Sequence, residues 1–132
     1  MNFLTILATY HGYNMSAQNS LVDLALIKRK IRWGHQPENP SLIKTWLNLE
    51  ERHIEDLPTI ELKRHQYEAQ FHLLVNTIED ALISNIWRQI CLDNIYQPLH
   101  SLHKLTDGNE SVHCLKTLSN KVAFISVDNI FD

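Results

Sequence analysis

The chain has 132 residues, of which 44% are hydrophobic and 20% are charged, and its formal net charge is −3. A chain of this length suits one hydrophobic core, since single domains usually hold about 100 to 150 residues. The negative charge excludes a general attraction to nucleic acid or anionic lipid, which only a local basic cluster could supply. With three glycines there is no glycine-rich phosphate loop, dinucleotide fingerprint or nucleophile elbow, so we expect no cofactor chemistry of those kinds.

The first part of the chain predicts a strand and two helices. We expect a short strand over residues 3–10, which form an apolar run too short to cross a bilayer. The capping-box pattern that Ser20 opens predicts a helix, and Gly34 ends it. A second helix has Pro40 as its first residue, where the missing N–H costs nothing, and ends before Pro58.

Residues 59–97 predict the central element, which is either one long helix or two helices that meet near Asp80. Its apolar residues recur at the three, four and seven residue spacings of one helix face; they are Ile60, Tyr67, Phe71, Leu74, Ile78, Leu82, Leu92 and Tyr96. The second half carries apolar groups on further faces, so neighbouring helices or a second copy of the chain should surround it. Pro98 cannot continue the helix without losing a hydrogen bond, which places a break at Gln97.

The remaining residues predict a short helix, a turn at 107–109, another helical segment and a closing strand. Residues 122–127 alternate enough to be that strand, and it would pair with residues 3–10. The expected fold is therefore mainly α, a small helical bundle around one long central helix at about 59–97, with a short two-stranded ribbon formed by the termini. We expect a single domain over 1–132; residues 1–15 are either part of it or a non-essential extension, because Met-Ser-Ala-Gln from Met15 resembles a natural start.

Eight histidines are a high number for this chain, and three of the residues on the central helix suggest a metal site. His65, Glu68 and His72 lie three and four residues apart, so two imidazoles and one carboxylate could face one divalent metal ion. The alternative is a solvent-exposed face on which acids and histidines four residues apart form weak pairs, an arrangement that is common on helices.

Residues 68–72, Glu-Ala-Gln-Phe-His, resemble the Asp-x-x-Phe-His segment in the helical ligand-binding domain of GntR-type transcription regulators. In that family the acid and the histidine hold a metal, so the resemblance implies the same role for Glu68 and His72. It covers five residues, has Glu where the family usually has Asp, and the later histidines follow at shorter distances than the family needs. The resemblance therefore does not assign the chain to that family.

A second group of potential ligands consists of Cys91, His100, His103, His113 and Cys114. These residue types suit a structural zinc ion, and His100 and His103 share a helical face, but the tight paired spacings of zinc sites are absent. Surface histidines and buried cysteines are the commoner interpretation. Because His113 and Cys114 are adjacent, they cannot be assumed to form a nucleophile and its base. We therefore predict no catalytic residues and favour a non-enzymatic protein.

A basic cluster ends the first predicted helix. Lys28, Arg29 and Arg32 could contact phosphates, with Trp33 available for stacking on a base. A structural alternative is that cations are favoured at a helix C-terminus by the helix dipole, without any ligand.

The expected function is binding. The apolar second half of the central element, with Ile83, Trp87 and Ile90 as the predicted interface, favours a small intracellular protein that acts by self-association or by binding a partner protein, in a regulatory or adaptor-like role. The two alternatives are a metal-binding or sensor protein and a nucleic-acid-linked regulator. The two cysteines form no dense disulfide framework, so we expect a cytoplasmic protein with no membrane partner.

Overall fold

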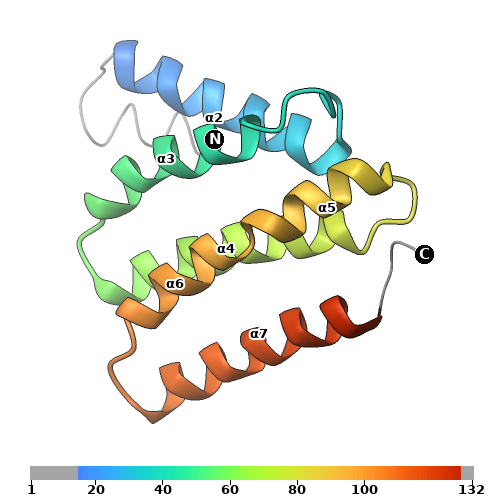
Figure 1. The fold of residues 1–132 in the computed structure, drawn as a ribbon. Coiled ribbons are helices and arrows are strands. Elements are labelled where there is room, and N and C mark those ends of the chain that lie inside the picture. Colours follow the sequence, from blue (N-terminus) through green and yellow to red (C-terminus); the bar gives the residue numbers. More distant parts are fainter. Residues whose placement is uncertain (1–14, 129–132) are drawn as a thin grey trace.

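The computed structural model describes the backbone of residues 15–128 and the side chains of residues 23–125. The regular elements of this range are α2 (Met15–Trp33), α3 (Leu42–Glu55), α4 (Ile60–Ile78), α5 (Asn85–Asn94), α6 (Tyr96–Lys104) and α7 (Asn109–Asp128), as Figure 1 shows. The mainly α class is therefore confirmed. Within the described residues no helix has the length and apolar character needed to cross a membrane. The predicted strand at 3–10 lies outside the described residues.

Helix α4 packs against α2, α3, α5 and α6, and two ion pairs give the direction of the last helix, α7 (Figure 1). Arg64, near the start of α4, pairs with Asp107 just before α7, and Glu79, just after α4, pairs with Lys121 in the second half of α7. Helices α4 and α7 therefore run in the same direction. Helix α6 packs against α4, α5 and α7 and runs in the direction opposite to α4 and α7 (Figure 1).

Helix α2 ends at Trp33, as Gly34 predicts. Gly34 has a φ of +60°, its N–H donates to the Ile31 carbonyl at 3.2 Å, and the N–H of His35 donates to the Lys30 carbonyl at 3.0 Å. These two hydrogen bonds form a Schellman motif, which satisfies carbonyls that have no partner within the helix. The indole of Trp87 donates to the same Ile31 carbonyl at 2.8 Å.

The central element is two helices, so the prediction of one continuous helix over 59–97 is wrong and its alternative, a junction near Asp80, is correct. Helix α4 ends at Ile78 and α5 begins at Asn85. The Asp80 carboxylate accepts from the N–H of Leu82 at 2.9 Å, and the Ser84 hydroxyl accepts from the N–H of Trp87 at 3.3 Å. Side chains that bond nearby backbone groups compete with helix continuation and favour turns and N-caps, which explains the reversal here.

The predicted break at Gln97 falls two residues too late. Helix α5 ends at Asn94 and α6 begins at Tyr96, so Pro98 lies in the first turn of α6. A proline ring clashes with the carbonyl four residues earlier, here that of Asn94, and is tolerated in the first turn, where its missing N–H matters least. The interruption therefore precedes the proline.

The predicted strand at 122–127 is wrong, because α7 continues to Asp128. The less exposed side chains of α7 recur at steps of four and three residues as far as its side chains are described; they are Ser111, Leu115, Leu118, Val122 and Ile125. This is the spacing of one helix face, and we call these five residues the α7 stripe. Since the stripe continues over Val122 and Ile125, the described side chains of that segment follow helical rather than alternating burial.

Most helices contribute to one hydrophobic core. Its largest fully buried side chains are Trp46 of α3, Phe71 of α4 and Trp87 of α5, and Val122 and Ile125 of α7 reach its edge. A smaller cluster joins Ile54, Tyr67 and Leu102. Both halves of the central element thus bury their apolar faces within one chain, by folding back on each other.

Candidate functional site

Lys28 of the predicted phosphate-binding cluster is engaged inside the molecule. Its Nζ lies 2.6 Å from Oε2 of Glu50, whose side chain is 6% exposed, and Oε1 of Glu50 accepts from Nε2 of Gln70 at 3.1 Å. A buried carboxylate requires such partners, because an uncompensated charge is costly away from water. Lys28 therefore links α2 to α3 and, through Glu50, to α4.

Arg32 is engaged in the same way at the other end of the cluster. Its Nη1 donates to Oδ2 of Asp80 at 2.9 Å, and its guanidinium lies 4.5 Å from the ring centroid of Trp33. The hydrogen bond from Arg32 holds the pKa of the Asp80 carboxyl below its ordinary value, and the N–H of Leu82 adds to the effect. Arg29 is the exposed member of the three. Two of the three predicted phosphate contacts thus serve intramolecular ion pairs.

The predicted metal ligands all lie on α4, and His65 and Glu68 line a hollow whose lining also contains Asp107, Glu110 and Cys114. His65 and His72 are exposed and Glu68 is half-buried, and the ring of His72 meets Phe71 edge-on at 5.5 Å between centroids. The structure also separates Cys91, whose thiol is fully buried and has its pKa raised to about 12 by burial, from exposed Cys114. Among the described side chains no group of three or more His, Cys, Asp or Glu is arranged to hold a metal ion.

The residues predicted as an interface lie largely in the core. Trp87 is fully buried, Ile83 is 9% exposed, and Ile90 is half-buried. The residues that directly precede Ile83 and Trp87 in the sequence are the exposed ones, since Leu82 is 94% and Ile86 is 70% exposed. Apolar spacing shows that a helix has more than one apolar face, but which face is covered depends on how the chain folds back.

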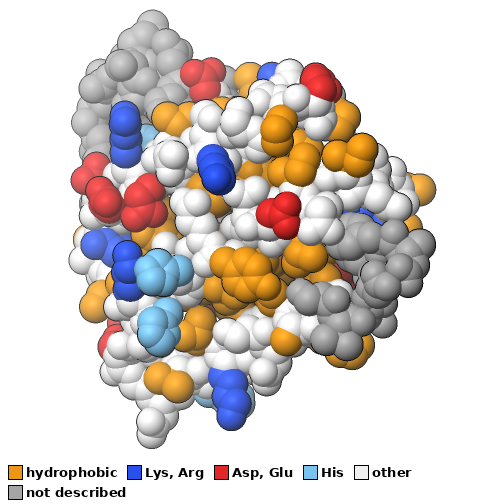
Figure 2. Space-filling view, in the orientation of Figure 1, with side chains coloured by type: hydrophobic (Ala, Val, Ile, Leu, Met, Phe, Trp, Pro, Cys, Tyr) orange, Lys and Arg blue, Asp and Glu red, His pale blue; other side chains and the backbone are white. Residues whose placement is uncertain are grey.

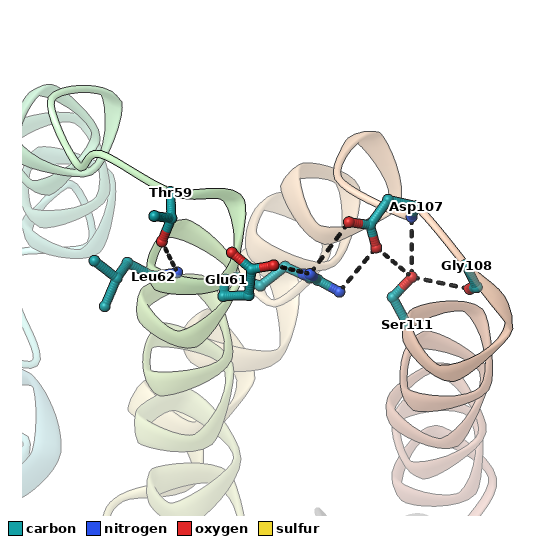
Figure 3. Close-up of polar contacts among 7 residues, drawn as sticks. Thr59, Glu61, Leu62, Asp107, Gly108 and Ser111 are labelled. Carbon is teal, nitrogen blue, oxygen red and sulfur yellow. Dashed lines mark hydrogen bonds and ion pairs between the residues drawn. The ribbon is translucent and has the colours of Figure 1, made fainter.

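The first of two hollows beside α7 is a polar one of about 540 Å³, between the start of α4, the end of α6 and the start of α7. Figure 3 shows its polar contacts: Arg64 pairs with both carboxylate oxygens of Asp107, at 3.2 and 3.4 Å, and approaches Glu61 at 4.0 Å. The Ser111 hydroxyl accepts from the N–H of Asp107 at 3.0 Å and lies 3.0 Å from the Gly108 carbonyl. These contacts fix the turn from which α7 starts.

The second hollow lies on the other side of the α7 stripe, between α6 and α7, and measures about 450 Å³. We call it the α6–α7 groove; it is lined by Tyr96, Leu99, His100, His103, Leu115, Ser119, Val122 and Ala123. Figure 2 shows exposed hydrophobic side chains over this part of the molecule, with histidines beside them. Unlike the first hollow, it is mainly apolar in its lining.

The walls of the α6–α7 groove have different shapes. On α6, Tyr96, His100 and His103 follow one another at helical spacing, and Tyr96 is 56% exposed. On α7, Ser119 and Ala123 are one turn apart, and such small residues let another backbone approach closely. The groove is therefore bounded by large rings on one side and by a low, narrow wall on the other.

Neither the groove nor its residues follow from the sequence patterns that suggested the other sites. His100 and His103 were grouped as zinc ligands, and Leu115 and Val122 were placed in a helix and a strand. The available signal was the α7 stripe, whose spacing extends past residue 122 and would have put Ser119 and Ala123 together on an adjacent face.

No family model, curated protein or solved structure matches this chain. The geometry of the described residues is therefore the basis on which a function is assigned.

Proposed function

We propose that this protein acts by binding another polypeptide chain, in an adaptor-like or regulatory role without chemistry of its own, and that the α6–α7 groove is its binding surface. The observation that supports this is an apolar floor of Leu99, Leu115 and Val122 beneath the half-exposed ring of Tyr96. Aromatic side chains at the edge of an apolar depression are typical anchors of protein interfaces.

The dimensions of the groove suit a short helix. Helix α6 has nine residues and therefore extends for about 13 Å, the length of two to three turns. A helix that lies along such a groove presents apolar side chains at every third or fourth position, which is a recurring mode of peptide recognition. The small side chains of Ser119 and Ala123 provide the clearance for it.

The experiment is photo-crosslinking in cells from a benzoylphenylalanine placed at position 123, in the groove. The matched control carries the same group at position 117, which is also exposed on α7 but does not line the groove. We expect a defined polypeptide adduct from position 123 only. Once that polypeptide is identified and purified, its affinity for the protein should fall on Ala123→Arg and be unchanged by Thr117→Arg. Equal adducts from both positions, or none from position 123, would refute the proposal.

Self-association is a second candidate, favoured by a separate surface at the junction of α2 and α5. Trp33, Leu82 and Ile86 are 52%, 94% and 70% exposed, and we call them the end patch. Exposed apolar side chains at one site can be covered by the same patch of a second copy, as in a two-fold symmetric dimer. Sedimentation of the wild type and of the variant Leu82→Glu with Ile86→Glu tests this. A concentration-dependent dimer that is lost in the variant is expected, and a monomeric wild type would contradict it.

A further inference from the structure

The charges that border the α6–α7 groove identify the kind of helix that fits it. We infer that the partner presents an amphipathic helix whose apolar stripe is flanked by acidic residues. This inference rests on the proposed function, because it names the partner of the same surface. It follows from three observations: the chemistry of the lining, the placement of the basic residues, and the nature of the groove walls.

The lining of the groove contains imidazoles and no carboxylates among the described residues. His100 and His103 stand on the α6 wall, and the N–H of an imidazole can donate a hydrogen bond to a carboxylate. Acidic side chains on a partner would meet donors here, whereas basic ones would meet no carboxylate. The apolar floor beneath the imidazoles lowers the competition from water, which strengthens such contacts.

Each of the two helices that form the groove carries a lysine next to its lining residues in the sequence. Lys104 follows His103 and His100 on α6, and Lys116 precedes Ser119 and Ala123 at the spacing of one helix face on α7. Both lysines are exposed. A helix seated between these walls would have one lysine on each side of its apolar stripe, so an acidic residue on each side would be paired.

Two further charged groups, on α5 and α7, have partners of their own. Asp93, seven residues before His100, accepts a hydrogen bond from Nε2 of Gln89 at 2.9 Å, and it is the acid that lies closest to the groove along α5 and α6. Lys121 pairs with Glu79 at 3.3 Å on the far side of α7. Neither of these two interactions involves Lys104 or Lys116.

The walls also determine the backbone form of the partner. An extended peptide gains its affinity from hydrogen bonds to the edge of a sheet, and both walls of this groove are helices. A helix satisfies its own backbone and needs only an apolar depression for its side chains. A concave groove also fits a ridge of side chains better than it fits the flat surface of a bilayer.

The test is selection from a phage-displayed library of helical peptides of about 18 residues, or five turns. The stripe positions are varied among apolar residues, and the flanking positions are varied among Glu, Gln and Lys. The library is selected on the wild-type protein and, in parallel, on Ala123→Arg and Ser119→Arg. The melting curves of both variants are compared with that of the wild type, so that only folded protein is used.

We expect peptides that bind the wild type but neither groove variant, with Glu enriched at the flanking positions. Their affinity should fall about fivefold on Lys104→Gln with Lys116→Gln, in line with the modest strength of exposed ion pairs. The control Lys44→Gln with Lys63→Gln, on α3 and α4, should leave the affinity unchanged. The same two pairs of variants are tested against vesicles that contain phosphatidylserine.

The outcomes separate the inference from the proposed function. The claim of an acidic partner would be refuted if the groove-dependent peptides carried Lys or Gln at the flanking positions. It would also be refuted if their affinity did not change on Lys104→Gln with Lys116→Gln. Either result would leave polypeptide binding at the groove intact. Vesicle binding that depends on Lys104 and Lys116, without selection of peptides, would overturn the inference in favour of a lipid surface. A selection that yields no groove-dependent peptide would contradict the proposed function itself.

Discussion

Replacing Gly34 by alanine should destabilise the protein, because two separate features of the structure require glycine there. Its φ of +60° is a conformation that side chains with a Cβ adopt at a cost of about 1 to 2 kcal/mol. A Cβ at this position would also lie 3.3 Å from Cγ2 of Ile83 and 3.3 Å from Cδ1 of Trp87. Both neighbours are in the core, so neither can move away freely.

The magnitude follows from these two effects and one that opposes them. The backbone conformation costs about 1.5 kcal/mol, and forcing atoms into a packed region adds at least about 1 kcal/mol. Alanine reduces the conformational entropy of the unfolded chain, which returns about 0.5 kcal/mol. The net loss in the free energy of unfolding is therefore about 2 kcal/mol, which corresponds to a fall in melting temperature of about 6 °C.

Urea unfolding followed by circular dichroism measures this loss, and the chain supplies its own control. A Cβ at Gly108 meets no atom within 4 Å, so Gly108→Ala should be nearly neutral. Gly34→Asn separates the two effects, since asparagine tolerates the left-handed conformation but carries the same Cβ. Its free energy of unfolding should lie between that of the wild type and that of Gly34→Ala. If Gly34→Ala matched Gly108→Ala, the close approach of α2 to the α4–α5 reversal would be wrong.

Three further measurements test the interior. Lys28→Ala should lower the free energy of unfolding by about 2 kcal/mol, because it leaves the buried carboxylate of Glu50 with one partner. Glu50→Gln should lower it by less. The opposite order in urea unfolding would contradict the role of Lys28 as the partner of a buried charge. Because the folded-state pKa of Asp80 is lowered, its stabilisation is present above the ordinary value of 3.8 and is lost as pH falls through the lowered one. The stability difference between wild type and Asp80→Asn should therefore disappear in acid. A thiol reagent should modify Cys114 in the native protein and Cys91 only after unfolding, so two reactive thiols per native chain would be inconsistent with the buried Cys91.

Local signals in the sequence were sufficient for much of the fold. Gly34 ends a helix because glycine adopts backbone conformations that other residues avoid, and Pro58 ends one because proline restricts the backbone. Both effects are local and do not depend on the rest of the chain. The reversal near Asp80 was predicted only as an alternative, because a polar turn within an apolar helical pattern is compatible with either form. The segment 122–127 was misread because its alternation competes with the spacing of the α7 stripe, which is clear only over a longer range.

The site could not be predicted because it depends on which helices become neighbours. Lys28 and Arg32 form a basic cluster in the sequence, yet their partners Glu50 and Asp80 stand 22 and 48 residues away and neutralise them in the fold. Trp87 was predicted as an interface residue, but it is fully buried and its indole donates to the carbonyl of Ile31. The α6–α7 groove exists only because α7 packs beside α6 along one stripe.

Helix α7 is held less extensively than the helices of the main core. Most of its described side chains are exposed, and its attachment includes the α7 stripe, the ion pair of Asp107 just before the helix and the ion pair of Lys121 in its second half. Elements with few buried apolar contacts open at lower free energy than the rest of a protein. Opening α7 would remove one wall of the groove. A partner bound in the groove would therefore stabilise the closed position of α7, and the closed position would strengthen partner binding by the same free energy. A bound partner should therefore slow amide hydrogen exchange along α7, even at residues on the face that it never touches.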